Sequence, residues 1–186
     1  GSRISDPVTF LDLAPTVLAL AGVARPAHFQ GRPLLAAAPA TPPRYAFGGR
    51  DRMDERYDMV RTVTDGRFRY MRNYAPHRPW AQHEAYEWQA AGYQAWERAH
   101  LAGTLNAAQS RFWGEKPAEE FYDLAADRDQ VDNLIDAREH RGRISAMRRA
   151  LDAHLVETHD AGFIPEGSPL EGHAESRAPG AYPLRR

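Results

Sequence analysis

Cysteine is absent from this chain of 186 residues. Its absence excludes disulfide bonds, thiolate metal sites and a cysteine nucleophile within these residues. No apolar run approaches the roughly 20 residues needed to cross a bilayer, and the first residues show no signal-peptide pattern. We therefore expect no membrane span in this sequence.

The sequence also has only one lysine and almost no net charge. The 24 basic residues include a single lysine, Lys116, and the formal net charge is −1. A whole-chain attraction to nucleic acid or to an anionic membrane is therefore not indicated. The preference for arginine fits a GC-rich genome as readily as anion binding, and we favour the genome. The length allows one substantial domain and leaves a second, small one open.

Several motifs of complete enzymes are missing. The sequence has no Gly-rich phosphate loop, no zinc-spaced histidine pair and no Gly-x-Ser-x-Gly elbow. Asp51, Asp54, Glu55 and Asp58 match no calcium-loop spacing, and we expect them to neutralise neighbouring arginines. No nucleophile, base and orienting group can be assembled. The chain alone is therefore not expected to be a complete enzyme.

Hydrophobic periodicity predicts a helix near each end of the chain. Residues 9–22 place Phe10, Leu13, Val17 and Leu20 on one stripe, which is too apolar to stand without a partner. Residues 140–158 form a second amphipathic pattern. We also expect one or two helices in 79–113, interrupted near Gly92 and Gly103, a turn with a brief helix in 125–133, and no core in 165–186.

Strands are predicted between these helices. Residues 59–64 and 67–73 alternate on either side of Asp65-Gly66, the strongest hairpin signal in the chain. Residues 45–49 and 119–124 are also strand-like.

Charged residues are concentrated between Tyr45 and Pro79. The segment contains eight arginines and five acids, namely Arg50, Arg52, Arg56, Arg61, Arg67, Arg69, Arg72 and Arg78 with Asp51, Asp54, Glu55, Asp58 and Asp65. Guanidinium groups can hold a sulfate, phosphate or carboxylate bidentately. The alternative is a salt-bridged surface, since most exposed charge runs contribute little else. Both interpretations stay open.

Five segments in order carry a resemblance to a known family. They are SDPVTFLDLAPTVLALAGV with FQGRPLL after it, YAFGGRDRMDERYDMVRTVTDGRFRYMRN, NYAPHRPWAQHEAYEWQ, EEFYDLAADRDQVDNL and HDAGFIPEG. Together they resemble the C-terminal portion of a sulfatase, in the alkaline-phosphatase-like superfamily. The resemblance covers nearly the whole chain, although Phe121 stands where the family usually has leucine.

The resemblance implies an α+β fold in which a small antiparallel sheet of about four strands packs with the long C-terminal helix. Residues 1–43, with the helix at 9–22 and a linker, would be the tail end of an α/β catalytic domain that is otherwise absent. Residues 44–160 would form the C-terminal sulfatase subdomain, and 161–186 an irregular tail.

The resemblance also implies chemistry that these residues lack. In the family a cysteine or serine within Cys/Ser-x-Pro/Ala-x-Arg matures to formylglycine and acts beside a calcium ion. The nearest serine here, in Ser145-Ala146-Met147-Arg148-Arg149, lacks the middle Pro or Ala and lies in the predicted helix. We expect no catalytic or metal-binding residue in this chain, with calcium and formylglycine in the missing catalytic half.

What the chain is expected to contribute is the rim of the substrate pocket. We assign six residues to it: Arg50, Arg52, Asp54, Glu55, His77 and Arg78. The intact enzyme would hydrolyse sulfate esters or sulfamates, and its partner would be a sulfated glycan or another sulfate ester. The family's frequent export favours a periplasmic or secreted parent enzyme. Two alternatives stay open: a stand-alone, non-catalytic anion- or glycan-binding domain, and the same portion of a phosphoester or phosphonate hydrolase.

Overall fold

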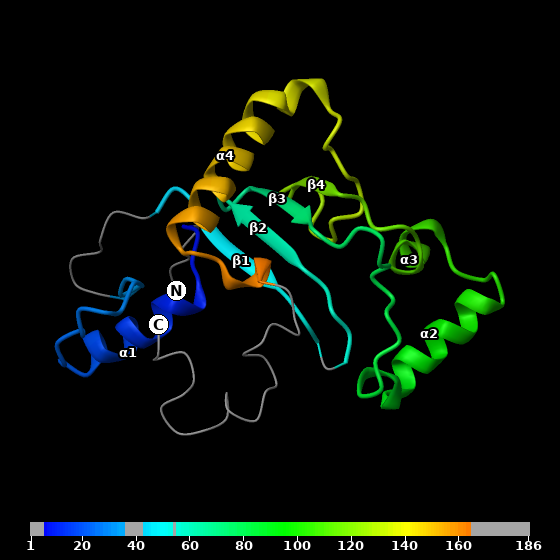
Figure 1. Ribbon diagram of the computed structural model, residues 1–186, viewed down its shortest axis with the longest axis horizontal. Coiled ribbons are helices and arrows are strands. Elements are labelled where there is room, and N and C mark those ends of the chain that lie inside the picture. Colours follow the sequence, from blue (N-terminus) through cyan, green and yellow to red (C-terminus); the bar gives the residue numbers. More distant parts are fainter. Residues whose placement is uncertain (1–5, 36–42, 54, 165–186) are drawn as a thin grey trace. The chain divides into compact units, whose positions relative to one another are not determined.

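The computed structural model describes residues 6–35, 43–53 and 55–164. They belong to two compact units, Gly1–Ala153 and His154–Arg186. The first unit contains a four-stranded antiparallel sheet in the order β1-β2-β3-β4, coloured from cyan to green in Figure 1. Its strands are β1 (Ala46–Arg50), β2 (Val60–Thr64), β3 (Phe68–Asn73) and β4 (Glu119–Asp123). The predicted small antiparallel sheet is confirmed.

The turn between β2 and β3 follows from its sequence. Gly66 has a φ of 94°, a conformation that glycine adopts without strain. Asp65 Oδ1 accepts hydrogen bonds from the backbone N–H groups of Arg67 (3.1 Å) and Phe68 (2.7 Å). The side chain thus fixes the register in which Thr64 lies opposite Arg69.

Gly49 of β1 makes room for a buried arginine on β2. Gly49 lies opposite Arg61, and a Cβ atom at Gly49 would lie 3.2 Å from the Arg61 side chain. Only 7% of the Arg61 side chain is exposed, and its Nη1 lies 2.9 Å from Asp51 Oδ1. Glycine at this position therefore lets a guanidinium lie against β1.

The core lies between the sheet and helix α4 (Arg141–Glu157). Val63, Tyr70 and Phe121 from the strands are fully buried, as is Met147 from the helix. The rings of Phe68 and Phe121 stack with centroids 5.4 Å apart. The predicted packing of a long helix on the sheet is therefore confirmed for the part of α4 in the first unit.

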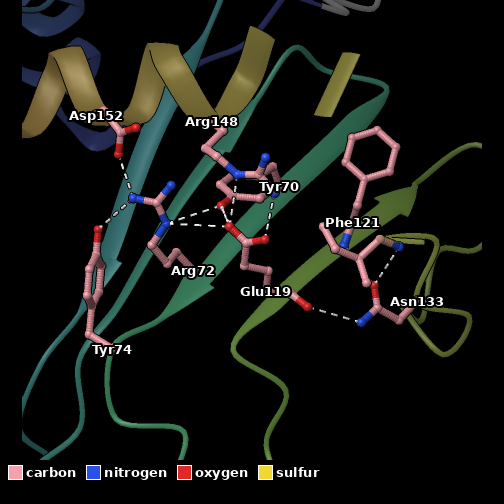
Figure 2. A network of polar contacts seen from close by, with 9 residues as sticks. Tyr70, Arg72, Tyr74, Glu119, Phe121, Asn133, Arg148 and Asp152 are labelled. Carbon is pink, nitrogen blue, oxygen red and sulfur yellow. Dashed lines mark hydrogen bonds and ion pairs between the residues drawn. The ribbon is translucent and has the colours of Figure 1, made fainter. Parts of the chain in front are cut away.

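Polar contacts fix the same helix on β3 and β4 (Figure 2). Arg148 binds Glu119 bidentately, with Nε to Oε1 at 2.9 Å and Nη2 to Oε2 at 2.6 Å. Tyr70 donates its hydroxyl hydrogen to Glu119 Oε1 at 2.5 Å, and Arg72 Nη1 lies 2.5 Å from Asp152 Oδ1. Bidentate pairs of this type fix orientation as well as adding energy.

Asn133, near the end of the EEFYDLAADRDQVDNL segment, binds the backbone of β4. Its Oδ1 accepts the backbone N–H of Phe121 at 2.9 Å, and its Nδ2 donates to the carbonyl of Glu119 at 3.2 Å (Figure 2). One side-chain amide thus satisfies both a donor and an acceptor along β4.

The N-terminal helical region is held by two polar side chains. It consists of the 3-10 turn η1 (Phe10–Asp12) and helix α1 (Leu13–Leu20). Asp12 Oδ1 accepts the N–H of Arg32 at 2.9 Å, and Thr16 Oγ1 accepts the N–H of Leu34 at 2.9 Å. We call these contacts the Asp12–Thr16 clamp, because they tie the FLDLAPT and GRPLL segments together.

The predicted apolar stripe on this helix is exposed. The exposed fractions are 90% for Phe10, 50% for Leu13, 64% for Val17 and 65% for Leu20.

The aromatic-rich segment before β4 is largely helical. It contains η2 (Glu87–Gln89), α2 (Ala91–Leu101), α3 (Ala107–Ser110) and η3 (Arg111–Trp113). The predicted interruptions near Gly92 and Gly103 are both present. The chain is extended at Ala90, between η2 and α2, and α2 ends before Gly103, whose φ is 67°. The stacked pairs Trp96–Phe112 (4.4 Å) and His100–Trp113 (4.6 Å) hold the segment together.

The prediction of a brief helix in 125–133 is wrong, although the predicted turn is present. These residues form turns, and Gln130 adopts a φ of 55°. A short helical turn occurs later, as η4 (Arg138–His140).

The described part of the second unit is short. It contains the end of α4 and the turn η5 (Ala161–Phe163), where Asp160 Oδ1 accepts the N–H of Gly162 at 2.8 Å. The predicted irregular tail lies outside the described residues from residue 165 onward. Within the described ranges, no helix has the length and apolar character to span a membrane.

Candidate substrate-binding surface

The charged segment folds against one short stretch of chain, residues 82–85. Arg50 Nη2 lies 3.5 Å from Glu84 Oε1, and Glu55 Oε1 accepts the N–H of Ala85 at 2.8 Å. Arg78 Nη1 donates to Gln82 Oε1 at 3.4 Å. Three of the six predicted rim residues, Arg50, Glu55 and Arg78, therefore meet at this stretch, which we call the linking segment.

Neighbouring residues strengthen the same attachment. Arg56 Nε donates to the carbonyl of His83 at 2.6 Å, and Gln82 Nε2 donates to the carbonyl of Tyr57 at 3.1 Å. The loop between β1 and β2 is thus bound to the linking segment through both backbone and side chains.

The electrostatics of this surface combine buried and exposed charge. The side chain of Glu84 is 1% exposed and lies beside the Arg50 guanidinium, which supplies the positive charge that a buried carboxylate needs. The hydrogen bond from Ala85 N–H, followed by that from its own backbone N–H, lowers the pKa of Glu55. Glu55 is therefore ionised at neutral pH and accepts hydrogen bonds.

The other three predicted rim residues lie differently. Arg52 is exposed on the loop after β1, and Asp54 lies outside the described residues. His77 is exposed and lines a hollow of about 480 Å³ together with Trp113 and Lys116. The assignment of all six residues to substrate binding stays a prediction.

Lys116, which lines the same hollow as His77, belongs to a buried ion pair. Lys116 Nζ lies 2.5 Å from Asp58 Oδ1, and the two side chains are 0% and 1% exposed. The same ammonium group lies 4.6 Å from the ring centroid of Trp80. We expected Asp58 to neutralise an arginine; its partner is instead the lysine 58 residues further along the chain, a pairing that no local pattern indicates.

A second hollow, of about 580 Å³, was also missed by sequence reasoning. Arg69 and Met71 of β3 line it with Glu120 and Tyr122 of β4. Residues from α3, η3 and the loops complete the lining: Trp80, Ala108, Arg111, Phe112, Gly114, Glu115, Pro117, Asp129, Gln130 and Val131. Alternation along β3 puts Arg69 and Met71 on the same face, but nothing local shows that Arg111 joins them.

The residues described here do not fit the calcium or formylglycine chemistry of sulfatases. Across residues 6–35, 43–53 and 55–164, no group of three or more histidine, aspartate or glutamate side chains is arranged to hold a metal ion. Ser145 lies within α4, where its Oγ accepts a hydrogen bond from Arg149 Nη1 at 2.7 Å.

Comparison with known proteins shows that this chain is similar to part of several sulfatases. No family model matches the chain. Over 168 residues, 89% of this chain, it is 31% identical to the ulvan-active sulfatase of Formosa agariphila, and it spans 28% of that protein. Its fold matches a 2-O GAG sulfatase with a TM-score of 0.58 and 20% identity, covering 86% of this chain and 27% of that one.

A further solved structure has a similar fold. It contains a protein in complex with its substrate, D-glucosamine-2-N,6-O-disulfate, and matches with a TM-score of 0.51 and 16% identity, covering 83% of this chain and 25% of that one. The chain is thus related to the sulfatases and corresponds to a C-terminal portion of them, which confirms the resemblance indicated by the sequence.

Proposed function

We propose that this chain forms the C-terminal subdomain of a sulfatase that removes sulfate groups from glycans. The observation that carries the proposal is the 31% identity to the ulvan-active sulfatase, which extends over 89% of the chain. In this proposal the formylglycine nucleophile and the calcium ion belong to a catalytic portion outside these 186 residues. The chain itself supports the fold and supplies part of the pocket rim.

The geometry of the linking segment supports this role. Arg50 and Arg78 are each held by a partner on residues 82–85, and Glu55 is held by a backbone N–H. Side chains fixed in this way lose less conformational freedom when a ligand binds than free arginines would. We propose that their remaining donors bind sulfate or carboxylate groups of the glycan, while Glu55 accepts hydrogen bonds from its hydroxyls.

The test compares two purified proteins. One is the 186-residue chain, and the other is the product of the complete coding region, including any upstream half with a Cys/Ser-x-Pro/Ala-x-Arg segment. We expect sulfate release from sulfated oligosaccharides by the longer product and none by the chain alone. Sulfate release by the chain alone would place the nucleophile within it and overturn the proposal. Phosphate ester hydrolysis without sulfate release would assign the chain to a phosphoester hydrolase instead.

A further inference from the structure

We infer that the two hollows form one groove that binds a glycan over at least two consecutive sugar units, with an anionic substituent in the second hollow. The inference rests on the proposed function and adds to it the length and charge of the substrate. None of the arginines concerned belongs to the predicted rim.

The first step is the continuity of the hollows. They have volumes of about 480 and 580 Å³, and Gly114 and Glu115 line both. Each volume lies within the range of about 300–1,000 Å³ that is usual for ligand sites. Their shared boundary includes a residue without a side chain, so a linear ligand can extend from one hollow into the other across Gly114.

The second step is the charge in the second hollow. Arg69 Nη1 donates to Gln130 Oε1 at 3.0 Å, and Arg111 Nη2 donates to the Tyr122 hydroxyl at 3.3 Å. These bonds orient two guanidinium groups along the same hollow and use one donor of each. A guanidinium has five N–H donors, so both groups retain donors for a sulfate or carboxylate.

The third step is the rest of the lining, which distinguishes a glycan from a polyanion. Glu115 and Asp129 are exposed at the second hollow, and Glu120 is buried in it. Carboxylates accept hydrogen bonds from hydroxyl groups but repel a continuous phosphate backbone. Trp80 and Phe112 add apolar surface. Donors, acceptors and aromatic rings together suit a sugar that carries only scattered anionic groups.

The experiment measures binding to the 186-residue chain by titration calorimetry. The probes are inorganic sulfate, D-glucosamine-2-N,6-O-disulfate, a heparin tetrasaccharide and the neutral cellotetraose. We expect the tetrasaccharide to bind at least about tenfold more tightly than the monosaccharide, because it occupies both hollows. We expect it to bind more tightly than cellotetraose, with an affinity that falls as salt increases. Equal affinity for one and four sugar units, or for neutral and sulfated chains, would overturn the inference.

Three arginine variants and two glycine variants locate the binding. Arg69→Gln and Arg111→Gln should each weaken tetrasaccharide binding by about tenfold, whereas Arg149→Gln, on the exposed face of α4, should not. Gly114→Leu should block the groove. Gly114 has extended backbone angles (φ −83°, ψ −178°), and a Cβ there would make only an ordinary 3.6 Å contact, so the fold should tolerate the change.

Gly142→Leu is the matched control, since a Cβ at Gly142 meets nothing within 4 Å. Equal losses from Arg149→Gln and Arg111→Gln would show unspecific charge attraction and overturn the inference, as would unchanged binding by Gly114→Leu. Thermal unfolding of each variant confirms that it is folded. The outcome is separate from the proposed function: sulfate release by the longer product together with no length-dependent binding would reject the groove alone.

Discussion

At the scale of single residues, the buried Asp58–Lys116 pair has the clearest consequence for stability. Both side chains are almost fully buried, and Asp58 Oδ1 also accepts the N–H of Met59 at 2.9 Å. Removing one member of such a pair leaves an uncompensated buried charge, which costs about 3–5 kcal/mol. We therefore expect Lys116→Met to lower the free energy of unfolding by about that amount, as measured by urea denaturation.

The double variant Lys116→Met, Asp58→Asn separates charge from packing. It should be more stable than Lys116→Met alone, because it no longer buries an unpaired carboxylate. A loss of less than about 1 kcal/mol for Lys116→Met would contradict the interpretation, since that is the range of exposed pairs.

Glu119 predicts a pH dependence of stability. Burial opposes its ionisation, but hydrogen bonds from Arg148 and Tyr70 and the charges of Arg148 and Arg72 outweigh this and lower its pKa. A folded-state pKa below the unfolded value of about 4.3 stabilises the fold above that value. The contribution is lost as pH falls through the lowered pKa.

Glu119→Gln should therefore lower the free energy of unfolding at pH 7, by about 1 kcal/mol given the partial exposure of the pair. The difference from the natural chain should stay constant down to about pH 5 and shrink below about pH 4. Urea unfolding between pH 3 and pH 7 measures it. A difference that grows on acidification would contradict the assignment.

At the scale of elements, the Asp12–Thr16 clamp explains why the FLDLAPT and GRPLL segments lie together. Gly31 passes so close to η1 that a Cβ there would lie 1.9 Å from the carbonyl oxygen of Leu11. Gly31→Ala should therefore separate the two segments. Asp12→Ala should weaken the contact between them by about 1–3 kcal/mol, because the N–H of Arg32 loses its acceptor.

Hydrogen exchange at the amides of Arg32 and Leu34 measures the clamp directly. Both substitutions should raise exchange at these amides, while amides of β2 and β3 keep their protection. Unchanged exchange in Gly31→Ala would show that the close approach does not hold in solution.

The elements also show what the sequence could predict. The β2–β3 hairpin was predictable because the Asp65 side chain and the positive φ of Gly66 act within a few residues. The interruption near Gly92 was predicted only to within two residues: the break lies at Ala90, and Gly92 itself is in the first turn of α2, where a glycine costs a helix only about 1 kcal/mol. Two features could not be predicted: the ion-pair partners of Arg50 and Asp58, and the second hollow. Both depend on contacts between distant segments, which local periodicity does not indicate.

At the scale of the whole molecule, the exposed stripe on η1 and α1 predicts how the chain behaves alone. Phe10, Leu13, Val17 and Leu20 are at least half exposed. A contiguous apolar surface of this type is usually covered by a partner, and in the proposed function that partner is the catalytic portion of the enzyme. We expect the purified chain to self-associate in sedimentation experiments at high micromolar concentration.

Charged substitution on the stripe tests the cause of that association. Val17→Glu with Leu20→Lys should increase the monomer fraction, whereas Leu101→Glu, at an exposed leucine of α2 outside the stripe, should not. In the complete enzyme of the proposed function, the same double substitution should instead be harmful. It would introduce charges into a covered interface and so lower the thermal stability. Two results together would contradict this interpretation: the unsubstituted chain stays monomeric, and the double substitution leaves the thermal stability of the complete enzyme unchanged. They would mean that nothing covers this helix.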